Sequence, residues 1–137
     1  MFDVAAEMAA LALPGVGGIG CFVGVVRGDV GLAALELEHY PGMTERQMGQ
    51  IAADATRRWE LLGCTVVHRV GRMTVGEGIV LVLAAAAHRQ AALDATAFLI
   101  DWLKTRAPFW KREWATDGSA TWVDARESDD ASAARWG

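Results

Sequence analysis

A cationic segment in the second half of the sequence has the residue types needed to bind and process an anion. Its basic residues are Lys104, Arg106, Lys111 and Arg112, and no carboxylate lies among them. The whole chain nevertheless has a formal net charge of -4. Lysine and arginine stabilise phosphate and carboxylate groups, and a lysine can also transfer protons. The segment therefore predicts an anion site that could support acid or base catalysis.

Pro108 divides this segment into two parts. Proline ends a helix and favours an extended conformation in the residue before it, so Lys104 and Lys111 should lie on either side of a bend. We expect the two lysines to face one another across a small space, with Phe109 and Trp110 packing the bend against the protein. Basic residues near a helix C-terminus also stabilise the helix dipole, which is the purely structural alternative.

His88 and Arg89 form a second candidate anion site. They precede a helix predicted over Gln90–Thr105, and the unpaired N–H groups at a helix N-terminus attract phosphate. At 1.5 Å per residue, Lys104 would lie about 20 Å along the axis from His88. One subunit's helix therefore cannot bring both ends to one small ligand. An elongated site shared with a partner's tail would join them.

Length and composition indicate one domain over residues 1–137. The hydrophobic content of 53% excludes a disordered chain. The longest apolar run, Ile79–Ala87, is too short to span a membrane, and no basic region precedes the apolar stretch at the N-terminus. We therefore expect a soluble, cytoplasmic protein. The acidic balance also argues against a nucleic-acid-binding surface.

Two other patterns argue against a metal ion or a cofactor. Cys21 and Cys64 lie far apart in apolar segments without zinc-type spacing, so we expect both to be small buried side chains. Gly15, Gly17 and Gly20 spell G-x-G-x-x-G, but they follow a predicted helix and precede a predicted strand. A dinucleotide-binding loop requires the opposite order. We predict no metal and no cofactor.

The first part of the chain predicts a short helix and two strands. Val4–Leu13 is rich in alanine and is followed by a helix-breaking Pro-Gly pair. Ile19–Arg27 and Leu32–His39 are rich in β-formers, and the glycine-containing segment between them indicates a hairpin. In the second strand leucines alternate with glutamates, which predicts one buried and one exposed face.

The middle of the chain predicts two helices packed on an antiparallel sheet. Thr44 and Gln47 have the spacing of a capping box, and the helix that follows should end near Gly63. Its buried stripe comprises Met48, Ile51, Ala52, Ala55 and Trp59. Cys64–Val70 and Ile79–Ala87 read as strands joined by a glycine-rich turn, and the second is apolar on both faces, as a central strand is. The end of the chain is predicted to start as a strand at Trp122. Its two tryptophans, Trp122 and Trp136, indicate that parts of this segment are docked against the rest of the protein.

Several of these segments together closely resemble the large, catalytic subunit of molybdopterin synthase. They read LEHYPGMT at 37–44, AHR at 87–89, KTRAPFWKRE at 104–113 and ARES at 125–128. The resemblance extends from about Gly18 to Trp136. It implies an α+β fold of the α/β-hammerhead type, with a mainly antiparallel sheet and two principal helices.

The resemblance also implies an activity and a set of partners. The family converts cyclic pyranopterin monophosphate into the dithiolene molybdopterin during molybdenum cofactor biosynthesis. Sulfur arrives on a small ubiquitin-like subunit, as a thiocarboxylate at its C-terminal Gly-Gly. The large subunit would form a homodimer within a heterotetramer.

Site residues follow from the matching motifs. Lys104 and Lys111 would face the reacting carbons and the thiocarboxylate as catalytic residues. The substrate would be bound by Arg27, His88, Arg89, Lys111, Arg112 and Arg126, the last serving the neighbouring subunit's site. Two alternatives remain from the residues alone: a non-catalytic anion-binding module, and a docking partner that only holds a small ubiquitin-like protein.

Overall fold

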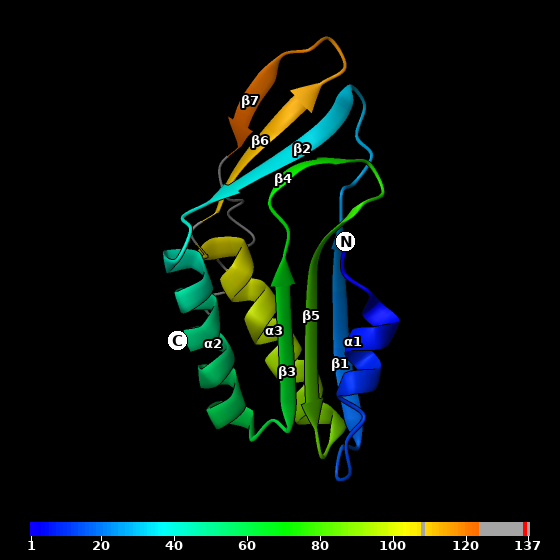
Figure 1. Cartoon of the computed structure of the whole chain (residues 1–137), viewed down its shortest axis with the longest axis vertical. Coiled ribbons are helices and arrows are strands. Elements are labelled where there is room, and N and C mark those ends of the chain that lie inside the picture. Colours follow the sequence, from blue (N-terminus) through cyan, green and yellow to red (C-terminus); the bar gives the residue numbers. More distant parts are fainter. Residues whose placement is uncertain (108, 124–135, 137) are drawn as a thin grey trace.

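The computed structural model describes residues 1–107, 109–123 and 136. In this part of the chain helices and strands are mixed, as predicted (Figure 1). The elements are α1 (Val4–Ala10), β1 (Gly18–Val25), β2 (Leu32–His39), α2 (Met43–Trp59), β3 (Gly63–His68), β4 (Gly71–Thr74), β5 (Gly78–Ala86), α3 (Arg89–Thr105), β6 (Phe109–Ala115) and β7 (Ala120–Val123).

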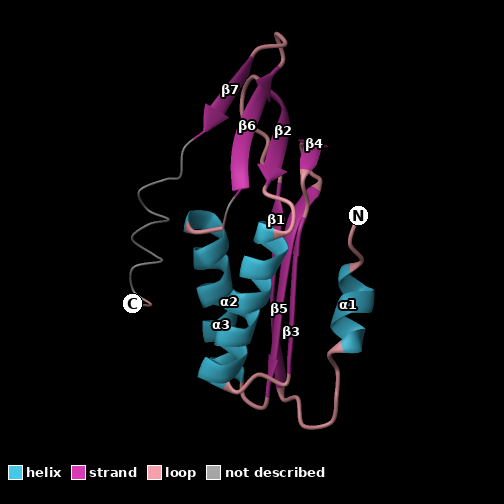
Figure 2. Ribbon diagram, turned by 60° about the vertical axis from the view of Figure 1, so that its left-hand side comes forward, coloured by secondary structure: helices cyan, strands magenta, loops and turns pink. Residues whose placement is uncertain are grey.

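The strands form two antiparallel sheets. The first has the order β1-β5-β3, with α2 and α3 on one face and α1 on the other (Figure 2). The second has the order β4-β2-β6-β7 and lies beyond the C-terminal end of α3, at the top of Figure 1. This confirms the predicted α+β fold, with its mainly antiparallel sheets and two principal helices, α2 and α3.

Strand β5 is central because it is apolar on both faces. Val80 and Val82 belong to a core cluster with residues of α2 and α3. The intervening Leu81 and Leu83 face the opposite side of the sheet and are also fully buried. Burying a side chain of this size contributes about 1.5–3 kcal/mol before the entropy cost of ordering the chain. A strand of this kind requires a neighbour on each edge, which β1 and β3 provide.

The predicted hairpin between β1 and β2 is wrong. β1 pairs with β5, whereas β2 pairs with β4 and β6 in the second sheet. The chain crosses between the sheets at Val26, whose carbonyl accepts from the Gly76 N–H at 2.9 Å and whose N–H donates to the Glu77 carbonyl at 3.0 Å. Strand β1 pairs with the distant β5 and not with the adjacent β2, because only β5 offers β1 a fully apolar partner.

Strand β4 lies in the segment that the sequence predicted as a turn. It has only four residues, too few to show a period, and it pairs with β2 so that Met73 is opposite Leu35. Met73 is fully buried. Positive φ angles of 91° at Gly71 and Gly76 turn the chain on either side of β4. These conformations favour glycine, so the glycines correctly indicated turns. The short strand between them was not predicted.

The start of α2 differs from the predicted capping box. The Glu45 carboxylate accepts from the Gly42 N–H at 2.5 Å, while the hydroxyl of the buried Thr44 accepts from the Tyr40 N–H at 3.1 Å. Gly42 is the N-cap, with a φ of 82°. The capping interaction therefore begins two residues before Thr44, and the Thr44–Gln47 prediction is wrong.

The two cysteines occupy different environments. Cys21 is exposed, contrary to the prediction, because β1 is an edge strand and its neighbour Gly20 faces α3. A Cβ added at Gly20 would lie 2.6 Å from the Ala92 carbonyl oxygen, so glycine allows α3 to approach β1. Cys64 is half-buried, and burial raises the pKa of its thiol to about 11.

Trp136 is docked, as predicted. Its indole N–H donates to the Asp101 Oδ2 at 2.6 Å, and its ring contacts those of Trp59 and Phe98 at 5.6 and 5.8 Å between centroids. Trp122, by contrast, is exposed, with the Arg112 guanidinium 4.4 Å from its ring centroid.

Candidate functional site

A cavity of about 540 Å³ lies between the two sheets at the C-terminal end of α3. Apolar side chains from both sheets form much of its wall, including Phe22, Leu35, Leu37, Val80 and Phe109. Three cations, Arg27, Lys104 and Lys111, also line it. This volume and this mixture of apolar walls with a few charged groups are typical of small-molecule sites.

The two lysines reach the cavity from either side of the bend between α3 and β6. Lys104 lies in the last turn of α3 and is exposed. Lys111 lies in β6, opposite Leu37 of β2 and Val123 of β7. Pro108 itself lies outside the described residues. Lys104 and Lys111 therefore line one cavity, as the sequence around the bend predicted.

Phe109 and Trp110 point to opposite faces of β6. The Phe109 ring stacks on His68, with centroids 3.8 Å apart and planes at 17°, and packs against the main core. Trp110 is 47% exposed and contacts the Tyr40 ring at 5.6 Å. The prediction that both rings pack inward is right for Phe109 and wrong for Trp110, since successive residues of a strand alternate between faces.

The same alternation places Arg112 outside the cavity. Its Nε lies 3.6 Å from Glu36 Oε1 and its Nη2 lies 3.9 Å from Glu38 Oε1. The guanidinium also lies over the rings of Trp114 and Trp122. Arg112 thus holds the face of the second sheet that points away from the cavity. Arg112 is not among the described residues that line the cavity, and its predicted role in substrate binding stays a prediction.

Arg27 follows β1 and lies at the cavity wall. Its Nε is 3.5 Å from Asp29 Oδ1, and the two side chains are 65% and 55% exposed. Ion pairs this exposed contribute little, about 0–1 kcal/mol. An incoming anion could therefore displace Asp29 from Arg27 at small cost.

His88 and Arg89 lie at the N-terminal end of α3, whereas Lys104, which lines the cavity, lies in its last turn. His88 is the N-cap, both side chains are exposed, and neither is among the described residues that line the cavity. The 17 residues of α3 span about 25 Å. One chain therefore does not bring these residues to Lys104, as the helix length predicted. Arg126 lies outside the described residues.

The polar residues of the cavity that were not identified from the sequence include Glu113 and His68. Glu113 follows Lys111 by two positions in β6 and shares its face. If the segment after Pro108 had been predicted as a strand, its two-residue repeat would have placed Glu113 on the same face as Lys111. His68 ends β3, and nothing local marks it, because it reaches the cavity only through the pairing of β3 with β5.

His68 has an altered acidity. Burial lowers the pKa of its imidazole to about 4. The nearby positive charges of Lys104 and His39 act in the same direction, while a hydrogen bond to the Arg69 carbonyl opposes them. The His68 ring is therefore neutral at pH 7.

The described residues contain neither a cluster of metal ligands nor a helix that could span a membrane. No group of three or more histidine, cysteine, aspartate or glutamate side chains there could hold a metal ion. None of the described helices has the length and apolar character needed to cross a membrane.

Comparisons with known proteins identify the family. The family model described as MoaE protein matches residues 1–106. The chain belongs to the MoaE family. The molybdopterin synthase catalytic subunit of Mesorhizobium japonicum is 58% identical over 139 residues, covering 98% of this chain and 87% of that protein. The subunit of the same name from Pseudomonas aeruginosa is 51% identical, covering 98% of this chain and 93% of its own.

Solved structures of the family share the fold. The MoaE protein of Burkholderia ambifaria is 53% identical and superposes with a TM-score of 0.83, covering 99% of this chain and 92% of its own. Molybdopterin synthase from Staphylococcus aureus is 26% identical, also with a TM-score of 0.83, covering 90% of this chain and 91% of that one. The family's arrangement of sheets is therefore kept across a wide range of sequences.

Proposed function

We propose that this chain is the catalytic subunit of a molybdopterin synthase, which inserts two sulfur atoms into cyclic pyranopterin monophosphate to form molybdopterin. Membership of the MoaE family and relatives 58% and 51% identical over nearly the whole chain support this function. The observation that carries it is the meeting of Lys104 and Lys111 in one cavity at the bend between α3 and β6.

The cavity suits an anionic heterocycle. Arg27, Lys104 and Lys111 supply positive charge for a phosphate, while Phe22 and Leu37 supply apolar walls for a fused ring. Positive side chains held in a partly enclosed cavity stabilise negative charge more strongly than the same groups in water. The phosphate would thus bind at the cations and the reacting side chain of the pterin would lie between the lysines.

The sulfur donor would be a small ubiquitin-like protein that ends in a Gly-Gly thiocarboxylate. Two glycines without side chains can follow a narrow, extended path into the cavity. The negative thiocarboxylate would be drawn to the same lysines that face the pterin. Donor and acceptor would then meet in one orientation, which is the main requirement for a reaction between two bound groups.

The two lysines would have different tasks. Within the described residues, no hydrogen bond or ion pair holds the Lys104 ammonium. Lys104 is therefore the better candidate to exchange protons as oxygen leaves and sulfur adds. Lys111 lies within a strand, between β2 and β7, and is better placed to hold a negative charge in a fixed position.

A complete site would use two copies of the chain. We propose a homodimer within a heterotetramer, in which His88, Arg89 and Arg126 of one subunit serve a site that includes its neighbour. The length of α3 supports this, because His88 and Arg89 lie about 25 Å from the lysine end of their own helix. Residues 1–137 would act as one domain in the cytoplasm. The exposed thiol of Cys21 is compatible with such a reducing compartment.

Reconstitution tests the proposal. The purified chain is mixed with a thiocarboxylated small protein and cyclic pyranopterin monophosphate, and the dithiolene product is measured. We expect product with the intact small protein and none with a version that lacks the terminal Gly-Gly. Binding of the pterin without product would indicate an anion-binding module. Binding of the small protein alone would indicate a docking subunit.

A further inference from the structure

His68 occupies the wall of the cavity that contains Lys104 and Lys111. Its Nδ1 lies 2.9 Å from the Arg69 carbonyl oxygen. A carbonyl can only accept, so in the neutral ring Nδ1 carries the hydrogen and Nε2 carries the lone pair. The stacked Phe109 ring, 3.8 Å away, fixes the plane of the imidazole. His68 is thus held in one orientation, with one nitrogen that can only accept a hydrogen bond.

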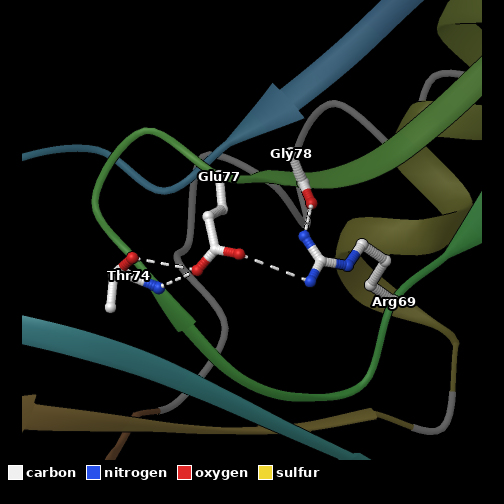
Figure 3. A network of polar contacts seen from close by, with 4 residues as sticks. All are labelled: Arg69, Thr74, Glu77 and Gly78. Carbon is white, nitrogen blue, oxygen red and sulfur yellow. Dashed lines mark hydrogen bonds and ion pairs between the residues drawn. The ribbon is translucent and has the colours of Figure 1, made fainter. Parts of the chain in front are cut away.

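A network of polar contacts stabilises the backbone at Arg69, whose carbonyl is hydrogen-bonded to His68. The Arg69 guanidinium donates to the Gly78 carbonyl at 2.8 Å and lies 3.5 Å from Glu77 Oε1 (Figure 3). The Glu77 carboxylate accepts from the Thr74 N–H at 2.5 Å and from its hydroxyl at 2.9 Å. These hydrogen bonds lower the pKa of Glu77. The carbonyl that accepts the hydrogen bond from His68 therefore belongs to a residue, Arg69, whose side chain is itself held by this network.

The charges around His68 favour a neutral ring. Lys104 on α3 and His39 on β2 both disfavour a second positive charge there, as does burial itself. Lys111 and Glu113 reach the same cavity from β6. A neutral acceptor and a carboxylate differ in how they affect the positive charge of Lys104. A carboxylate would pair with Lys104 and compete with an anionic ligand, whereas an imidazole can orient the ammonium and leave its charge available.

Lys104 requires such an acceptor. Its flexible four-carbon stem allows many positions of the ammonium, and within the described residues no hydrogen bond or ion pair selects one of them. We propose that His68 positions Lys104 in the substrate complex by accepting a hydrogen bond from its ammonium at Nε2. This inference rests on the proposed function, since it assigns a positioning residue to the lysine that exchanges protons.

Three variants test the acceptor. His68→Phe keeps an aromatic ring for Phe109 to stack on and removes the acceptor, whereas His68→Gln offers an amide oxygen in its place. His39→Phe is the matched control, because His39 lies 6.3 Å from the same Phe109 ring and is not among the described residues of the cavity. We expect His68→Phe to lower the single-turnover rate on the order of tenfold, the size of effect that mispositioning produces, with pterin affinity nearly unchanged. His68→Gln should recover most of the rate, and His39→Phe should retain it.

Two further measurements do not require turnover. Heteronuclear NMR of the imidazole nitrogens should show His68 neutral near pH 7, with its hydrogen on Nδ1. With the pterin bound and no sulfur donor present, modification of Lys104 by an amine-selective reagent, followed by peptide mass spectrometry, should change in rate in His68→Phe and stay unchanged in His39→Phe. A structural role for His68 alone would not alter the reactivity of Lys104 in a folded variant.

The outcomes separate this inference from the proposed function. If the unaltered protein forms no dithiolene, the proposed function fails, while NMR and lysine modification still test the role of His68. If His68→Phe turns over as fast as the unaltered protein, the inference is overturned and the function stands. A normal His68→Phe together with a slow Glu113→Gln would assign the orientation of Lys104 to Glu113 instead. A charged His68 ring at neutral pH would also overturn the inference.

Discussion

The two sheets of this protein are stabilised by different interactions. In the first, β5 is buried on both faces and packs with α2 and α3 into a continuous apolar cluster. In the second, the apolar cluster is small, and the outer face is held by polar contacts, in which Glu36 accepts from the Trp114 indole N–H at 2.9 Å and pairs with Arg112. The cavity lies where the two meet. Apolar packing thus supplies a rigid support, and the more polar sheet brings charged side chains to it.

Breaking the apolar layer should have the largest effect on stability. Leu99 of α3 is fully buried in the main cluster, so Leu99→Ala should lower the free energy of unfolding by about 2–5 kcal/mol. Leu35 of β2 lies in the smaller cluster and keeps 8% of its surface exposed. Leu35→Ala should therefore cost less. Denaturant unfolding of both variants tests the comparison, and an equal loss would contradict it.

Replacing Lys104 should have the largest effect on turnover. If its amine exchanges protons, Lys104→Arg should lose nearly as much as Lys104→Ala, on the order of a hundredfold, because arginine stays charged. Pterin affinity measured by calorimetry should fall far less. Arg106→Ala is the control, since Arg106 is exposed and is not among the described residues of the cavity. Near-normal turnover of Lys104→Arg would leave Lys104 as an anion ligand only.

The acidity of His68 predicts how stability depends on pH. Its pKa is about 4 in the folded protein and 6.5 in the reference state, so between these values the unfolded chain binds more protons. The unfolding free energy should therefore fall as the pH drops from 6.5 to 4, by up to roughly 3 kcal/mol at 1.36 kcal/mol per pH unit. Unfolding of the unaltered protein and of His68→Phe across this range measures the difference. Equal slopes would show that His68 does not contribute.

Lys111 and Arg112 are neighbours on opposite faces of β6, so replacing each of them should affect a different property of the protein. Lys111→Ala should weaken pterin binding on the order of tenfold, as expected for loss of one charge-assisted contact. Arg112→Ala should instead reduce stability by about 1–3 kcal/mol, because it removes the ion pairs that Arg112 forms with Glu36 and Glu38. Calorimetry and thermal unfolding on both variants separate the two roles. The reverse pattern would mean that Arg112, not Lys111, faces the substrate.

The sequence predicted those features that depend on local patterns. Helical spacing located α2 and α3, although the capping box of α2 joins Gly42 to Glu45 and not Thr44 to Gln47. The apolar character of both faces of β5 predicted its central place. The motif around Pro108 predicted that Lys104 and Lys111 share one cavity, because a helix followed by a strand at a tight bend leaves few other arrangements.

Tertiary structure decided what depends on partners distant in the sequence. The composition of β1 and β2 suits a hairpin equally well, and only the availability of β5 and β6 assigns the two strands to different sheets. The registration of β6 against β2 then turns Lys111 toward the cavity and Arg112 toward Glu36, a choice that a one-residue shift would reverse. The pairing of β3 with β5 likewise places His68 at the wall of the cavity that Lys104 also lines. A sequence determines which residue types are present and how they repeat, but which of them meet depends on long-range pairing that buries the most apolar surface.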